Sequence, residues 1–244
     1  MAIDPELSKP DHIKLAFKFC KMALEQNIDN VKAMINLGLI YKHTGSPGEA
    51  LKMFESALEK DNTCIEAYVN MGAIQYEEYS HYDKAAMLFL DALELNPIDE
   101  EALCNLALAL KKTQYVDYAR LAFEEAMNVS PGNSHILTNY MMFLLEQQNF
   151  EQFAKVMPHA RRILDRREME NITKLHDEFK EAVEGTKGKT LPEDEASKPQ
   201  SAAGGPTTRQ GSKLASALKQ RLAGLKGKYA NKGLAVIPED DDQQ

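Results

Sequence analysis

Apolar residues recur every three or four positions from about residue 10 to residue 184, with polar and charged residues between them. This spacing predicts a series of amphipathic helices and no β-strands. The pattern then returns along the chain, because Ala50 recurs as Ala85 and again as Ala119, 69 residues after Ala50. That separation is two periods of about 34 residues plus one inserted residue, which lies in the turn 77–85. The pattern therefore predicts a repeat protein built from pairs of helices.

Each predicted pair has small residues where its two helices would approach closely, and a phenylalanine in its second helix. We expect the phenylalanines to fill the space between successive pairs. The small residues of the first helices are Gly38, Gly72 and Ala107, those of the second helices are Ala50, Ala57, Ala85, Ala92, Ala119 and Ala126, and the phenylalanines are Phe54, Phe89 and Phe123.

The residues between the helices are typical of turns. Gly45 is suited to end a helix in the left-handed conformation. The run from Ser46 to Glu49 has the pattern of a capping box, with Pro47 at the first helical position. The run 80–83 predicts a second, weaker cap.

The combination of Leu37-Gly38, Tyr41, Ala50 and Phe54, repeated in the later units, resembles the tetratricopeptide repeat. The tryptophan position of that repeat holds Met34, Tyr68, Leu103 and Leu137 instead. The resemblance implies an all-α fold, a superhelical solenoid of helix–turn–helix repeats, and the composition of residues 185–244 adds the prediction of a disordered C-terminal tail. It divides the first 184 residues into a half repeat at 10–30, repeats at about 31–64, 65–99 and 100–133, a degenerate repeat at 134–167 and a capping helix at 168–184.

The two ends of this array differ from a regular repeat. Residues 10–30 align with the second helix of a repeat whose first helix is missing. We therefore expect either that the chain is a fragment or isoform of a longer array, or that a partner covers the open apolar end. At the other end, an apolar stripe predicts a helix that caps the array; its members are Met169, Ile172, Leu175, Phe179 and Val183.

The composition changes near Gly185. Residues 1–184 are acidic, whereas residues 185–244 are basic, contain eight of the 13 glycines and lack phenylalanine. Such a segment has too few large apolar groups to offset the entropy of ordering it. We therefore predict a flexible linker at 185–212, a short basic amphipathic helix at 213–232 and an acidic tail at 233–244.

Several classes of protein are excluded by the sequence. The apolar runs are too short for a membrane-spanning helix, and charged residues occupy the region where a secretory signal would need an apolar core. The three isolated cysteines do not form a disulfide framework and favour a reducing, cytoplasmic location. We found no catalytic, phosphate-binding or metal-ligand spacing, so we predict no enzyme activity, no cofactor and no metal site.

The resemblance also implies where a partner would bind, since the first helix of each repeat lines the concave side of such arrays. The groove predicted in this way is mainly apolar with a mixed charged edge, which suits an amphipathic helix or an extended peptide of a partner protein. Its predicted binding residues are Ile35, Leu39, Lys42, His43, Val69, Tyr76, Cys104, Leu108, Lys111, Lys112, Thr138 and Met142.

Two narrower relationships can be compared with the sequence. Chaperone-binding members of the family clamp a terminal carboxylate with paired cations and asparagines. Only Asn70 matches that set, and Glu101 reverses a charge. The five matching positions here hold Ile35, Leu39, Asn70, Glu101 and Asn105. We therefore reject the chaperone-cofactor interpretation. Residues 106–131 and 139–150 resemble the last repeats of the tetratricopeptide subunit of the Bardet–Biedl (BBSome) ciliary coat. The resemblance implies membership of a multisubunit trafficking complex, with the cilium or basal body as its location. The residues that carry it are Ala119, Phe123, Ala126, Asn139, Tyr140, Leu144 and Leu145.

The basic segment is the other candidate for binding. It has six cations and no acid, and its leucines form one helical stripe. Its targets could be an acidic partner protein, an anionic membrane, nucleic acid or the acidic repeats themselves, and a tail without function is the remaining alternative. The residues proposed to act are Lys213, Leu214, Leu218, Lys219, Arg221, Leu222, Leu225, Lys226 and Lys228.

Together these observations predict a non-catalytic protein–protein scaffold or adaptor, a subunit of a larger assembly without a small-molecule substrate. The alternative is a peripheral membrane or nucleic-acid binder that acts through 213–232, although the net charge of −8 argues against nucleic acid. The effect of salt on binding distinguishes the scaffold from the membrane or nucleic-acid binder, because binding to phosphate or lipid headgroups weakens steeply with ionic strength.

Overall fold

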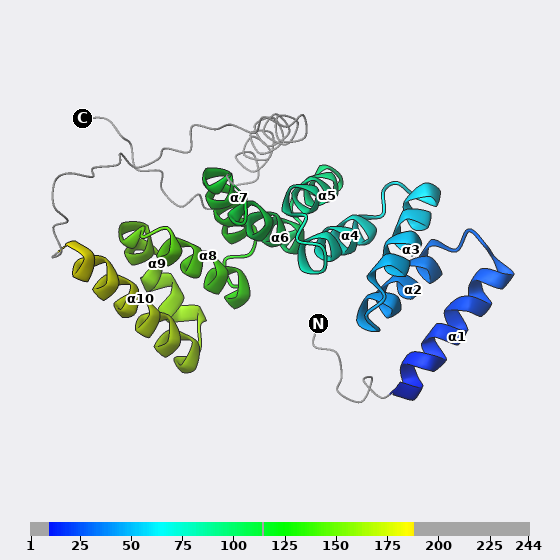
Figure 1. Cartoon of the computed structure of the whole chain (residues 1–244), viewed down its shortest axis with the longest axis horizontal. Helices are drawn as coiled ribbons and strands as arrows, with labels where there is room; N and C mark the ends of the chain where they lie inside the picture. The colour runs from blue at the N-terminus through cyan, green and yellow to red at the C-terminus, as the bar shows by residue number, and fades with distance from the viewer. Residues whose placement is uncertain (1–9, 114, 188–244) are drawn as a thin grey trace. The chain divides into compact units, whose positions relative to one another are not determined.

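A computed structural model describes residues 10–113 and 115–187. These residues form ten α-helices and no β-strand, which confirms the predicted all-α fold (Figure 1). The chain divides into two compact units, with the division between Thr113 and Gln114. This division falls between the two helices of the repeat predicted at 100–133.

Unit 1 contains six helices in its described part. The second and third helices form one antiparallel pair and the fourth and fifth form the next, while α1 packs against α2 and α6 packs against α5. The first helices of successive repeats are also in contact, α2 with α4 and α4 with α6. The bounds are α1 Pro10–Gln26, α2 Val31–His43, α3 Pro47–Lys60, α4 Ile65–Glu77, α5 Tyr82–Leu95 and α6 Glu100–Lys111.

The close approach of the paired helices depends on glycine. A Cβ atom added to Gly38 would lie 2.6 Å from Cε1 of Phe54, and one added to Gly72 would lie 2.6 Å from Cε1 of Phe89. Each phenylalanine ring therefore packs against the glycine of its own repeat. The prediction that these rings fill the space between successive pairs was incomplete, although the cluster that holds Phe54 does extend to Ile74 of the next pair.

The turns agree with the sequence in part. Gly45 has a φ of 73°, the predicted left-handed conformation, and Pro47 is the first residue of α3. The predicted capping box does not form, because the side chain of Ser46 makes no cap hydrogen bond and Glu49 instead pairs with Lys52 at 2.7 Å. The cap predicted at 80–83 does not form either, because the side chain of His81, which precedes α5, makes no cap hydrogen bond. In that turn Ser80 itself adopts the left-handed conformation, with a φ of 53°.

Unit 2 contains four helices in its described part, α7 Val116–Val129, α8 Ser134–Glu146, α9 Phe150–Ile163 and α10 Arg166–Lys187. Phe123 of α7 lies against α8, with ring-centroid distances of 5.8 Å to Tyr140 and 5.3 Å to Phe143. Burial raises the pKa of the Tyr140 hydroxyl, and the nearby Glu124 carboxylate raises it further. The Tyr140 hydroxyl donates to that carboxylate at 3.4 Å, and Arg120 holds the same oxygen at 2.8 Å.

The degenerate repeat is closed by aromatic stacking. Phe153, which replaces the expected small residue, is 1% exposed and stacks on the His176 ring of α10 at a centroid distance of 4.9 Å. Phe150 meets the same ring edge-on at 5.7 Å. A large residue fits at position 153 because α10 supplies a flat ring there. Helix α10 begins two residues before the predicted capping helix and continues to Lys187, so residues 185–187 are helical and the rest of the predicted linker lies outside the described residues.

None of the helices in the described parts of the chain is both long and apolar enough to cross a bilayer.

Candidate peptide-binding face

The candidate binding face is formed by α2, α4 and α6 of unit 1, which contact one another in that order. Each is the first helix of a pair or of a predicted repeat, so equivalent positions lie 34 or 35 residues apart. Residues at equivalent positions of neighbouring parallel helices form rows across such a face. Each row is named by its position in the repeat, where position one is Val31 in α2, Ile65 in α4 and Glu100 in α6.

The residues at the fifth position are buried. Ile35 is 4% exposed, Val69 is 6% exposed and Cys104 is 3% exposed. Ile35 belongs to the buried cluster that contains Met71 and Ile74 of α4, so its side chain packs between first helices. These three predicted binding residues therefore leave almost no side-chain area for a partner.

The other predicted residues of unit 1 have accessible side chains. The ninth and twelfth positions are half-buried and the thirteenth position is exposed. Lys42 of α2 lies 3.5 Å from the Glu77 carboxylate of α4, so the two helices are linked across the face. The half-buried residues are Leu39, Lys42, Tyr76, Leu108 and Lys111, and the exposed ones are His43, Glu77 and Lys112.

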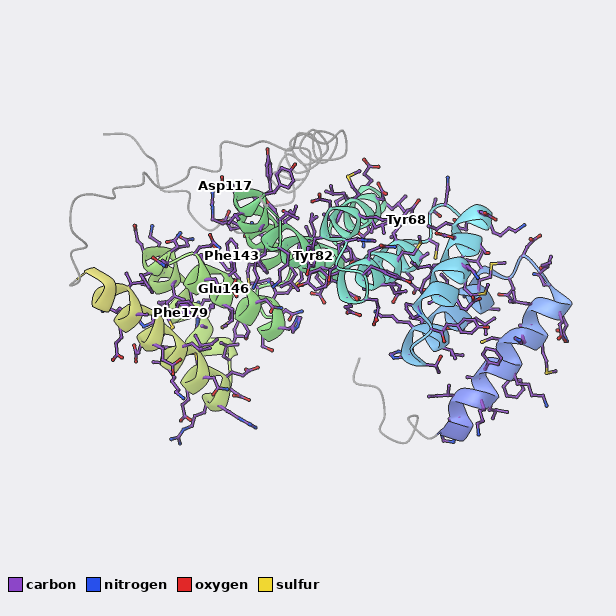
Figure 2. The ribbon with its side chains drawn as sticks, viewed as in Figure 1. Tyr68, Tyr82, Asp117, Phe143, Glu146 and Phe179 are labelled. Carbon is purple, nitrogen blue, oxygen red and sulfur yellow. The ribbon has the colours of Figure 1, made fainter. Side chains whose placement is uncertain are left out.

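Tyr76 is positioned by a second tyrosine. Its ring packs edge-on against Tyr82 at the start of α5, with centroids 5.3 Å apart and planes at 62°. Figure 2 marks Tyr82, together with Tyr68 on α4, within unit 1. Burial raises the pKa of the Tyr68 hydroxyl, and the Asp91 and Glu94 carboxylates contribute to the same shift.

A row of asparagines occupies the sixth position. In the sequence, Asn70 and Asn105 were compared with a carboxylate clamp, but the asparagines were not identified as a row. Asn36 lies on α2, Asn70 on α4 and Asn105 on α6. Asn139 has the equivalent sequence position on α8, which belongs to unit 2. Asn36 is exposed, and Asn70 and Asn105 are half-buried. The signal is present in the sequence, because the same amide side chain recurs at the repeat spacing, but a pattern built on apolar and small residues does not include it.

The amide group suits this row to the recognition of a peptide backbone. An asparagine side chain has one carbonyl acceptor and two N–H donors, and so matches the donor and acceptor of a peptide unit. Nδ2 of Asn70 donates to the Glu66 carbonyl oxygen of its own helix at 2.8 Å. This bond uses one N–H of the amide, whose full capacity is two N–H donors and one carbonyl acceptor.

The remaining predicted residues lie elsewhere. Thr138 and Met142 are half-buried on α8, so they belong to unit 2 and not to the face of unit 1. Asn139 contacts the ring of His135 at 3.4 Å on the same helix. The basic-tail residues, Lys213, Leu214, Leu218, Lys219, Arg221, Leu222, Leu225, Lys226 and Lys228, all lie outside the described residues.

The described residues hold no group of three or more histidine, cysteine, aspartate or glutamate side chains that could bind a metal ion. Cys104 is buried, and burial raises the pKa of the Cys20 and Cys64 thiols. A raised thiol pKa reduces the thiolate that acts as nucleophile. The accessible groups of the face are amides, apolar side chains and charged side chains, among which Lys42 and Glu77 form an ion pair.

Comparisons with known proteins agree with the repeat. The tetratricopeptide repeat family model matches residues 31–64. No curated protein sequence matches the chain. Among solved structures, the chain resembles MamA, with 19% identity, a TM-score of 0.55, and coverage of 71% of this chain and 99% of that one.

Two further structures have the same fold. PilF of Pseudomonas aeruginosa is 15% identical, with a TM-score of 0.56, and the match covers 73% of this chain and 91% of PilF. YrrB, described as a tetratricopeptide-repeat protein with an unusual peptide-binding site, is 23% identical with a TM-score of 0.55. That match covers 69% of this chain and 87% of YrrB.

Proposed function

Because residues 31–64 are a tetratricopeptide repeat and the chain has the tetratricopeptide-repeat fold, we propose that this protein is a non-catalytic adaptor that binds an extended segment of a partner protein. The binding site is the face of α2, α4 and α6, and the row Asn36, Asn70 and Asn105 holds the backbone of the bound segment. The observation that carries this proposal is the recurrence of the amide at the repeat spacing on helices that contact one another.

The spacing of the row fits an extended chain. Packed helices lie about 8–10 Å apart, so successive amides of the row are separated by about that distance. An extended peptide advances about 3.3 Å per residue, and three residues therefore span about 10 Å. Each asparagine can then pair with one peptide unit in every three, which gives recognition of the backbone with little dependence on sequence.

Selectivity comes from the side chains beside the row. Leu39 and Leu108 offer apolar area, and the half-buried Tyr76 offers an aromatic ring fixed by Tyr82. Charged groups of both signs border this area, among them Lys112 and Glu77. We therefore expect the bound segment to contain apolar side chains with charges of both signs nearby, and not a run of one charge.

The test is selection of binding peptides from a random peptide library displayed on phage, using the full chain and the Asn70→Ala variant. We expect the full chain to select peptides and the variant to bind the same peptides at least about 10-fold more weakly, because two hydrogen bonds to the backbone are lost. Asn62→Ala, which changes an exposed asparagine in the turn before α4, is the matched control and should bind normally.

A second measurement isolates the backbone contact. Selected peptides carrying one N-methylated amide are compared along their length, since N-methylation removes a donor and leaves the side chain unchanged. Affinity should fall at every third residue. Equal loss at all positions, or normal binding by Asn70→Ala, would show that asparagines do not hold the backbone.

The narrower predictions from the sequence concern the setting of this adaptor. Membership of a multisubunit complex, a cytoplasmic or ciliary location and binding through the basic segment 213–232 stay predictions. High salt distinguishes the last from the proposal, because binding through 213–232 to an anionic surface would be lost in salt, whereas binding on the mixed-charge face would persist.

A further inference from the structure

Helix α1 has two apolar faces. One face packs on the neighbouring helices of unit 1, where the Phe17 ring meets the Tyr41 ring of α2 edge-on at 5.6 Å and Leu24 packs against the buried cluster of α2, α3 and α4. The other face points outward and carries large apolar side chains, with Leu15 49% exposed, Phe19 58% exposed and Met22 42% exposed. Large apolar side chains that are exposed together on one helix are typical of a surface that binds a protein, a membrane or a ligand.

The outward stripe is symmetric about Phe19. Four residues away on either side lie Leu15 and Ala23, and three residues away lie Ala16 and Met22. At equal distances from Phe19, each large residue is therefore matched by an alanine. The ends of the stripe, seven residues from the centre, are polar on both sides. The complete stripe is His12, Leu15, Ala16, Phe19, Met22, Ala23 and Gln26.

We propose that this stripe pairs with the same stripe of a second copy of the chain, as an antiparallel helix pair with a two-fold axis at Phe19. A two-fold interface brings each residue opposite the residue at equal distance on the other side of the axis. Leu15 then faces Ala23 of the second copy and Met22 faces its Ala16, so a large side chain meets a small one in the layers on either side of the central pair of Phe19 rings. This is the size complementarity that packed helices require.

The charges beside the stripe set how this pair responds to salt. One edge of the stripe carries Lys14, Lys18, Lys21 and Glu25, a net charge of +2 for each copy. The Lys21 ammonium lies 4.7 Å from the centre of the Phe17 ring, so it is held toward the side of α1 that faces α2. In the antiparallel pair Glu25 comes near Lys14 of the other copy. The remaining lysines repel across the interface, and salt screens that repulsion.

The experiment is sedimentation equilibrium of the full chain. One pair of short helices buries less surface than a standard interface, so we expect a reversible dimer with a dissociation constant of about 1–100 μM. Added sodium chloride should strengthen it. In the Phe19→Glu variant two carboxylates meet at the axis and two buried rings are lost, so dimerisation should weaken by at least about 100-fold.

Two controls make the result decisive. Ile98→Glu changes an equally accessible apolar residue of unit 1 outside α1, where Ile98 is 44% exposed, and should leave the dimer unchanged. Circular dichroism of Phe19→Glu should match that of the unchanged chain, because Phe19 is not part of the core. A monomer at all these concentrations, a dimer that persists in Phe19→Glu, or a dimer that salt weakens would each overturn the proposal. The last result would indicate an acidic partner surface for α1.

Discussion

The replacement of Gly72 by alanine tests the packing of the repeat most directly. In α4 the added Cβ would lie 2.6, 2.8 and 3.0 Å from three atoms of the Phe89 ring, whereas relaxed carbon contacts are about 3.5–4.0 Å. Phe89 is 1% exposed and cannot move into solvent, so α4 and α5 must separate or the ring must leave its preferred rotamer. Such overpacking costs about 1–3 kcal/mol, and three close atoms favour the upper value.

An opposing effect must be subtracted from that cost. Alanine is a better helix former than glycine by about 1 kcal/mol, so Gly72→Ala gains this amount in the helix interior. We therefore expect a net loss of about 2 kcal/mol in the free energy of unfolding. The measurement is urea denaturation of the full chain followed by far-ultraviolet circular dichroism, where the midpoint should fall.

A matched control separates packing from helix propensity. Gly48 lies near the start of α3, is exposed, and its added Cβ would have only the Tyr79 hydroxyl within reach, at 4.0 Å. Gly48→Ala should therefore stabilise the chain by a few tenths to about 1 kcal/mol. If Gly72→Ala stabilises the chain as much as Gly48→Ala does, α4 and α5 do not approach each other as closely as the structure shows. A further check is Phe89→Leu, which should cost less in the Gly72→Ala background than alone, since it relieves the contact.

Two other predictions concern pH and thiol chemistry. Burial raises the pKa of Tyr140 in the folded chain above its ordinary value of 10.0, so the stabilisation linked to this pKa shift is complete below pH 10 and is lost as the pH rises further. Between pH 8 and pH 11, the free energy of unfolding in urea should therefore fall by about 1 kcal/mol more for the unchanged chain than for Tyr140→Phe. Equal losses would contradict the burial of this hydroxyl. Cys104 is 3% exposed, so iodoacetamide at pH 8 should modify it only after unfolding in urea. Mass spectrometry of the digested chain measures the modification. Rapid labelling of the native chain would refute the prediction.

The order of the helices could be predicted from the sequence because the information is local. Spacing of apolar residues specifies each helix, and the period of about 34 residues specifies the pairs. The role of Gly38 was also predicted, since only a residue without a side chain allows a helix to approach a ring so closely. The capping box was predicted wrongly, because Glu49 has a competing partner one turn away in Lys52.

The candidate site was predicted less well. The equivalent positions of the first helices were placed correctly on α2, α4 and α6, but the pattern could not separate Ile35, which is buried, from Leu39, which is half-buried. Both are aliphatic and both lie on the same side of α2. The difference arises from α4, whose Met71 and Ile74 share a cluster with Ile35. The asparagine row was visible in the sequence, but Asn70 and Asn105 were compared only with a carboxylate clamp and not with each other.

The sequence by itself therefore determined the helices, their pairing and the repeat, because each depends on contacts between residues near one another in the chain. Tertiary structure alone decided which side chains remain accessible. It buries Ile35, Val69 and Cys104, places His176 of α10 against Phe153 and leaves Phe19 of α1 facing outward. Accessibility depends on helices that are distant in the sequence, and no local pattern records how much of a side chain those helices cover.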